Sequence, residues 1–160
     1  MTEIRVKIAE FAVGKREGTL ATVGLGSCVA IALYDAEVCV GGLAHVLLPS
    51  ETMSRDRKNP GRFPATAVPV LLQRMRGLGA SQRRVTARLA GGASMFNSLL
   101  PKTGIQIGER NVLATLQALE HAGVPVAAQE VGGSHGRSVF LRLSDGKLTV
   151  RSLYKGDVIL

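Results

Sequence analysis

The chain has 160 residues, a formal net charge of +8 and 46% hydrophobic residues. This composition predicts one folded domain over residues 1–160 and excludes a disordered chain. No apolar stretch reaches the roughly 20 residues that span a bilayer. The N-terminus lacks the apolar centre of a secretion signal. We therefore expect a cytoplasmic protein with no membrane insertion, whose two cysteines are free thiols.

The positive charge favours acidic partners, although a basic surface that serves only solubility fits as well. Residues 55–58, Arg-Asp-Arg-Lys, form the densest basic cluster of the first half. A nucleic-acid partner is not expected, because four Phe, two Tyr and no Trp are too few for a base-stacking platform.

Strand patterns fill the first third of the chain. Alternating residues at 4–13 predict one strand, and residues 19–23, 28–35 and 38–48 predict three more. We expect these strands to form an antiparallel meander. Residues 49–64 are polar and bounded by prolines, which predicts a long surface loop.

Two helices are predicted in the remainder. Apolar residues at helical spacing from Val68 to Leu78 predict the first, and those from Val112 to Leu119 predict the second, closed by Gly123. Further strand patterns lie at residues 83–92, at 124–131, and in a hairpin over 137–153 that turns at Asp145 and Gly146. The predicted class is α/β or α+β, a mixed and largely antiparallel sheet covered by helices.

Cys28 follows the glycine-rich bend GLGS and opens one of the predicted strands. It could be a small core residue or a nucleophile, and a nucleophilic thiol needs a base nearby. His121 fits the end of a helix, where a cation is favourable, and His135 lies in a glycine-rich loop. His45 interrupts an apolar strand, which makes it the candidate base, although such a histidine is more often a hydrogen-bonded core residue.

A hairpin centred at position 36.5 would place Cys28 directly opposite His45. Thr22, on the preceding strand, could accept a hydrogen bond from the imidazole and hold its orientation. Glycines in the bend would leave backbone N–H groups at Gly26 and Ser27 free to bind an oxyanion. The sequence thus predicts a site for acyl transfer.

Two other site types use the same residues. Cys28, Cys39 and His45 could bind zinc, but no CxxC pair or further convincing histidine completes a tetrahedral site. The GLGSC segment could hold phosphate, yet it lacks the Lys-Ser/Thr of a P-loop and precedes a strand rather than a helix. We therefore expect neither a metal nor a cofactor, and we interpret Cys39 as a core residue.

Five segments, in this order along the chain, resemble the CheD family of chemoreceptor glutamine deamidases: TVGLGSCVAIALYD, GGLAHVLLP, GGASMF, IGERN and GGSHGR. The resemblance implies an α/β sandwich similar to the catalytic domain of cytotoxic necrotizing factor toxins. It also implies a catalytic cysteine, histidine and threonine, which match Cys28, His45 and Thr22. Glu130 departs from the aspartate expected before GGSHGR, and this leaves the three catalytic positions unchanged.

The resemblance further implies a reaction and partners. Glutamines on the cytoplasmic helices of methyl-accepting chemoreceptors would become glutamates through a cysteine thioester, with no cofactor. Some family members also hydrolyse glutamyl methyl esters, and some bind the phosphatase CheC. A docking module without catalysis is the alternative from another class, and a cysteine peptidase or transglutaminase is the enzymatic alternative. A monomer is expected.

Overall fold

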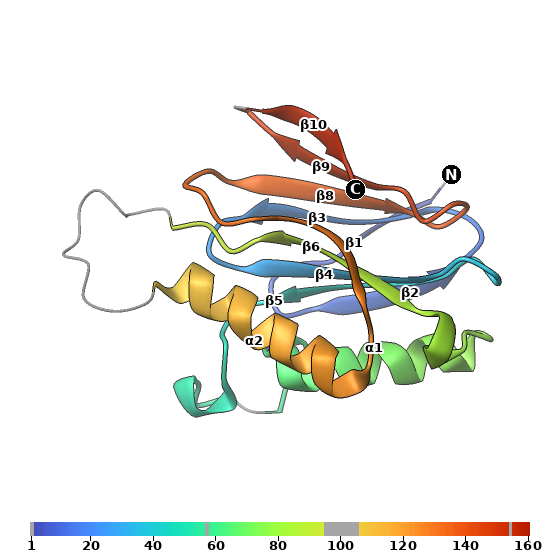
Figure 1. The fold of residues 1–160 in the computed structure, drawn as a ribbon, viewed down its shortest axis with the longest axis horizontal. Coiled ribbons are helices and arrows are strands. Elements are labelled where there is room, and N and C mark those ends of the chain that lie inside the picture. Colours follow the sequence, from blue (N-terminus) through green and yellow to red (C-terminus); the bar gives the residue numbers. More distant parts are fainter. Residues whose placement is uncertain (1, 57, 95–105, 154) are drawn as a thin grey trace.

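The computed structural model describes residues 2–56, 58–94, 106–153 and 155–160. These residues form two five-stranded sheets and two α-helices. The two helices lie together on one side of the molecule (Figure 1). Sheet A contains, in spatial order, β1 (Glu3–Arg5), β3 (Thr19–Leu25), β8 (Arg137–Arg142), β9 (Leu148–Ser152) and β10 (Gly156–Ile159). Sheet B contains β2 (Phe11–Lys15), β5 (Val40–Val46), β4 (Val29–Asp35), β6 (Thr86–Gly91) and β7 (Val126–Val131).

Most neighbouring strands are antiparallel, and each sheet holds one parallel pair, β1 with β3 and β6 with β7. The helices are α1 (Pro64–Gly77) and α2 (Ile107–Ala122). The predicted mixed α/β class, rich in antiparallel pairs, is therefore confirmed. The prediction of one sheet is wrong, because the strands form two separate sheets.

Sheet B is the middle layer of the molecule and has two apolar faces. Val29, Ile31 and Leu33 of β4 pack in one hydrophobic cluster with α1 and α2, whereas Ala30 and Ala32 pack toward sheet A. Every residue of β4 is buried as a result. This double coverage explains why its sequence is a continuous apolar run and not an alternating one.

Both predicted helices are present, and both are longer than their apolar patterns. Helix α1 begins at Pro64, a residue well suited to a first helical position, and ends at Gly77. Helix α2 begins at Ile107, five residues before the predicted start, and is closed by Gly123 with a φ of 71°. Among the helices of the described residues, none is long and apolar enough to cross a membrane.

The strand predicted at residues 4–13 is wrong. β1 joins sheet A and β2 joins sheet B, and the chain passes between the sheets over residues 6–10. The predicted meander is also wrong, because the bend at 26–28 carries the chain from β3 in sheet A to β4 in sheet B. Alternation along a strand reports its two faces and says nothing about which sheet the strand joins.

The other local predictions are mostly confirmed. The predicted loop at 49–64 is irregular, with two short 3-10 helices at Glu51–Met53 and Pro60–Arg62. Two features differ from the prediction. The first is β10, which was not predicted, and the second is Cys39. Cys39 is not a core residue, because it is half-buried in the turn between β4 and β5 with a positive φ of 55°.

Candidate active site

A hydrogen bond joins the two sheets at Thr22 and His45. The Oγ1 atom of Thr22 on β3 lies 2.7 Å from Nδ1 of His45 on β5, and it also lies 2.6 Å from the carbonyl oxygen of Val6. The hydroxyl has one hydrogen, which it donates to Val6, so Oγ1 accepts from Nδ1–H of the imidazole. Nε2 of His45 then carries the free lone pair. This atom is buried and has no hydrogen-bond partner among the described residues.

Cys28 lies at the end of the bend that leads into β4, on the same face as His45. The β4–β5 register places Ala30 opposite His45 and Val29 opposite Val46, so Cys28 is a diagonal neighbour of His45. The predicted direct pairing of Cys28 with His45 was therefore wrong by two residues. A shift of two keeps both side chains on the face toward sheet A, where Thr22 also lies.

Burial changes the ionisation of both groups. His45 has no exposed surface, and burial lowers its pKa to about 4. Cys28 is 7% exposed, and burial raises the pKa of its thiol, an effect partly opposed by its own backbone N–H. At neutral pH the thiol of Cys28 and the imidazole of His45 are thus both uncharged, and Nε2 is the nitrogen that can accept a proton.

The bend at 26–28 is held by its carbonyl groups. The carbonyl of Gly26 accepts from Ala93 N at 2.9 Å, and that of Cys28 accepts from Gly92 N at 2.8 Å. Among the described residues, no carbonyl accepts a hydrogen bond from the N–H groups of Ser27 and Cys28. The half-buried bend therefore keeps N–H groups beside the thiol that can bind an oxyanion.

The glycine turn at 91–92 fits closely around this bend. Gly91 has a φ of 109°, and a Cβ atom on it would lie 2.3 Å from the carbonyl oxygen of Cys28. On the other side of the turn, a Cβ on Gly108 of α2 would lie 2.3 Å from the carbonyl oxygen of Ala93. Only glycine permits these approaches, so the turn connects the start of α2 with the cysteine.

Asn111 of α2, which was not among the predicted site residues, contacts the bend directly. Its Nδ2 atom donates to the carbonyl of Ser27 at 2.8 Å and to the carbonyl of Leu47 at 3.1 Å. Asn111, Thr115 and Leu119 follow one another at intervals of four residues and are all buried. A polar residue in line with the buried positions of a helix could have indicated a role for Asn111. The predicted helix began at Val112 and so left Asn111 out.

Cys39 and the other two histidines have different surroundings. Cys39 occupies the turn of the β4–β5 hairpin, whereas Cys28 and His45 lie toward its open end, so these three residues do not form a zinc site. His121 is exposed in the last turn of α2, as predicted for a helix-end residue. His135, in the loop between β7 and β8, lies 3.9 Å from the carboxylate of Glu130.

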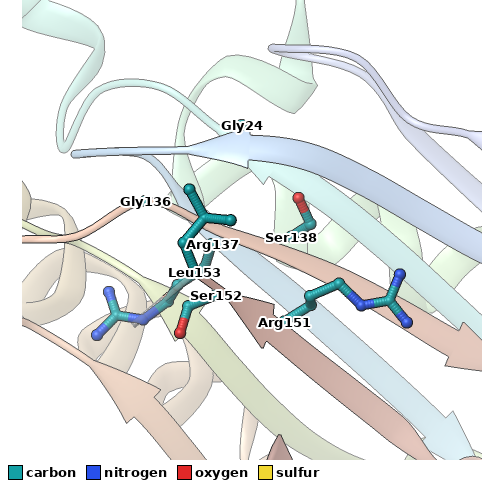
Figure 2. A pocket seen from close by; sticks show the side chains of 7 residues that line it. All are labelled: Gly24, Gly136, Arg137, Ser138, Arg151, Ser152 and Leu153. Carbon is teal, nitrogen blue, oxygen red and sulfur yellow. The ribbon is translucent and has the colours of Figure 1, made fainter. Parts of the chain in front are cut away.

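A pocket of about 320 Å³ opens over β3, β8 and β9, and Figure 2 shows its lining residues. None of Thr22, Cys28 and His45 lines it. The Arg137 guanidinium is buried and donates to the carboxylate of Glu130 and to the carbonyl of Gly91. Arg137 therefore supports the glycine turn beside the cysteine rather than offering a free charge to the pocket.

Comparison with known proteins places the chain in a family. Residues 47–152 match the family model described as "CheD chemotactic sensory transduction". A relative from Pyrococcus abyssi is 44% identical over 98% of this chain and 96% of its own length. The chain belongs to the CheD family. A relative from Pyrococcus horikoshii is 42% identical over 99% of this chain and 98% of its own length. A relative from Clostridium botulinum is 40% identical over 96% of this chain and 95% of its own length.

All three relatives carry the name "Probable chemoreceptor glutamine deamidase CheD". The CheD family model begins after Thr22, Cys28 and His45, whereas the alignment with the first relative covers nearly the whole chain. The crystal structure of the hypothetical protein YfiH from Bacillus licheniformis is a distant match. It has a TM-score of 0.43 and 17% identity over 72% of this chain and 46% of that chain, and this similarity is too low to establish a shared fold.

Of the CheD-like segments, GGASMF extends to Met95 and Phe96, which lie outside the described residues.

Proposed function

We propose that this protein is a glutamine deamidase that acts on chemoreceptors, with Cys28 as nucleophile and His45 as base. The observation that carries the proposal is the hydrogen bond from His45 to Thr22. It leaves the lone pair of Nε2 free on the face that Cys28 shares. The names of the CheD relatives support glutamine as the substrate.

The first half of the reaction breaks the carbon–nitrogen bond of the glutamine side chain. Nε2 of His45 takes the thiol proton of Cys28 as sulfur attacks the carboxamide carbon. The carbonyl oxygen becomes an oxyanion, which N–H groups of the bend at 26–28 stabilise. The imidazolium then gives its proton to the departing nitrogen, so ammonia leaves and a thioester remains.

The second half returns the enzyme to its resting state. His45 takes a proton from water as the water oxygen attacks the thioester carbon, and the carbon–sulfur bond breaks. The sulfur recovers a proton from the imidazolium, and the product is glutamate. A glutamyl methyl ester would form the same thioester with methanol as leaving group, so one site serves both reactions. Neither half requires a cofactor.

Basic residues of the 49–64 segment are suited to engage acidic receptor helices. Arg55 and Lys58 are exposed, Asp56 pairs with Arg62 at 3.5 Å, and Arg57 lies outside the described residues. Reversal of charge at Arg55 and Lys58 should weaken receptor binding, and added salt should weaken binding of the wild type. Salt-independent binding, or no effect of the reversal, would refute this role.

Isotope-resolved peptide mass spectrometry on a chemoreceptor cytoplasmic fragment tests the function. We expect site-specific conversion of glutamine to glutamate by the wild type, and none by Cys28→Ala. Cys39→Ala is the matched control, because it removes the other cysteine from the far end of the hairpin and should keep full activity.

If the wild type binds the fragment and converts no glutamine, the protein is a docking module and the proposed reaction is wrong. Docking on a CheC-type phosphatase rests on the family resemblance alone, and binding to purified CheC tests it separately.

A further inference from the structure

Three consecutive carbonyl groups in the bend at 26–28 each accept a hydrogen bond. The backbone N–H of Ala93 holds the first, at Gly26, and the backbone N–H of Gly92 holds the third, at Cys28. The second, at Ser27, is held by the side chain of Asn111 at 2.8 Å. The peptide unit just before the cysteine is thus the one whose orientation depends on a side chain.

The geometry of a trans peptide bond links this contact to the reaction. The C=O of one residue and the N–H of the next point in opposite directions in the same plane. The described residues contain no cis peptide bond. When Nδ2 of Asn111 holds the carbonyl of Ser27, the N–H of Cys28 therefore points away from α2. That N–H donates to no carbonyl of the described residues and lies beside the thiol.

The second hydrogen bond of Asn111 reaches the strand that carries the base. Nδ2 also donates to the carbonyl of Leu47 at 3.1 Å, two residues after His45. The β4–β5 ladder ends at the pair Val29 and Val46, so the amide group bridges the two strands just beyond their last pair. One side chain thus holds the backbone next to both Cys28 and His45.

Asn111 is fully buried, and its Oδ1 atom has no partner among the described residues. A buried polar group with an unpaired oxygen costs stability, so packing alone would favour an apolar residue here. We propose that Asn111 is a positioning residue that orients the peptide bond between Ser27 and Cys28, so that the N–H of Cys28 faces the oxyanion. This inference rests on the proposed function of Cys28.

Two small reagents that react with Cys28 test the inference without the receptor. Acylation by p-nitrophenyl acetate passes through an oxyanion, as nitrophenolate leaves and a thioester forms. Alkylation by iodoacetamide displaces iodide from a saturated carbon and forms no oxyanion. Both rates are measured on the Cys28 peptide by mass spectrometry, for the wild type and for Asn111→Leu.

We expect Asn111→Leu to slow acylation about 30- to 300-fold, near the loss caused by removal of one oxyanion donor, and to change alkylation by less than about threefold. Equal slowing of both reactions, or no slowing of acylation, would overturn the inference. Asn111→Ser is made alongside in case the leucine variant does not fold, and the same comparison of the two reactions applies to it.

Thr115→Val is the matched control. Thr115 is buried one turn later on the same face of α2, and among the described residues its hydroxyl bonds only to the carbonyl of Asn111. This variant should change neither rate by more than about threefold, because the bend keeps its hydrogen bonds. Failure of the proposed function can be distinguished from failure of this inference. If the wild type is acylated at Cys28 and yet converts no receptor glutamine, the proposed function is wrong, whatever the effect of Asn111→Leu.

Discussion

The hydroxyl of Thr22 orients the imidazole of His45 across the interface between the two sheets. Thr22 belongs to sheet A and His45 to sheet B, and 2.7 Å separates Oγ1 from Nδ1. The hydroxyl itself is oriented by the carbonyl of Val6, which follows β1. The tautomer of the imidazole therefore depends on correct packing of the two sheets.

Replacement of Thr22 by Val should leave Nδ1 of His45 and the carbonyl of Val6 buried without partners. We expect kcat to fall about 10- to 100-fold, because the imidazole loses its fixed tautomer. The free energy of unfolding should fall by about 1–3 kcal/mol. Thr22→Ser keeps the hydroxyl and should retain most of the activity. Equal activity of the Val and Ser variants would show that the contact has no catalytic role.

Stability should depend on pH through His45. Its pKa is about 4 in the folded protein and near 6.5 in the unfolded chain, so between these values the unfolded chain binds more protons. Stability should fall as pH decreases from about 6.5, by about 3 kcal/mol at pH 4, because each unit of pKa corresponds to about 1.4 kcal/mol. At a pH well above 6.5 the group is neutral in both states and contributes no slope.

Denaturant unfolding at several pH values, compared between the wild type and His45→Gln, isolates this contribution. The variant should lack the part of the slope that His45 causes. Parallel curves for the two proteins would show that His45 is not held neutral by burial.

Gly91→Ala should damage the site through the backbone of Cys28. The new Cβ would lie 2.3 Å from the carbonyl oxygen of Cys28, at a residue whose φ is 109°. We expect a loss of more than about 2 kcal/mol in unfolding free energy and a large fall in kcat. Gly132→Ala is the control, because Gly132 also has a positive φ but has open space around it. Similar losses in both variants would mean that strain in φ, and not the approach to Cys28, decides the outcome.

Much of the candidate site could be predicted from the sequence, because its residues lie on or next to β3, β4 and β5, which follow one another along the chain. The contact between Thr22 and His45 was predicted and is present. The register error of two residues between Cys28 and His45 did no harm, since side chains of a strand alternate with a period of two.

Other features depend on contacts that local patterns do not encode. The assignment of β1 and β2 to different sheets follows from packing on both sides of sheet B. The contact of Asn111 with Ser27 spans 84 residues of sequence. Hydrophobic periodicity can indicate that a residue such as Asn111 faces the core, but it does not indicate which distant segment that residue contacts.

Hydroxylamine partitioning tests the covalent role of Cys28 most directly. Hydroxylamine competes with water for a thioester, so receptor glutamines treated with the wild type in its presence should become glutamyl hydroxamates at the positions that otherwise become glutamates. Cys28→Ala should form neither product. Formation of glutamate at an unchanged rate, with no hydroxamate at any hydroxylamine concentration, would contradict a thioester on Cys28 and the mechanism proposed for this site.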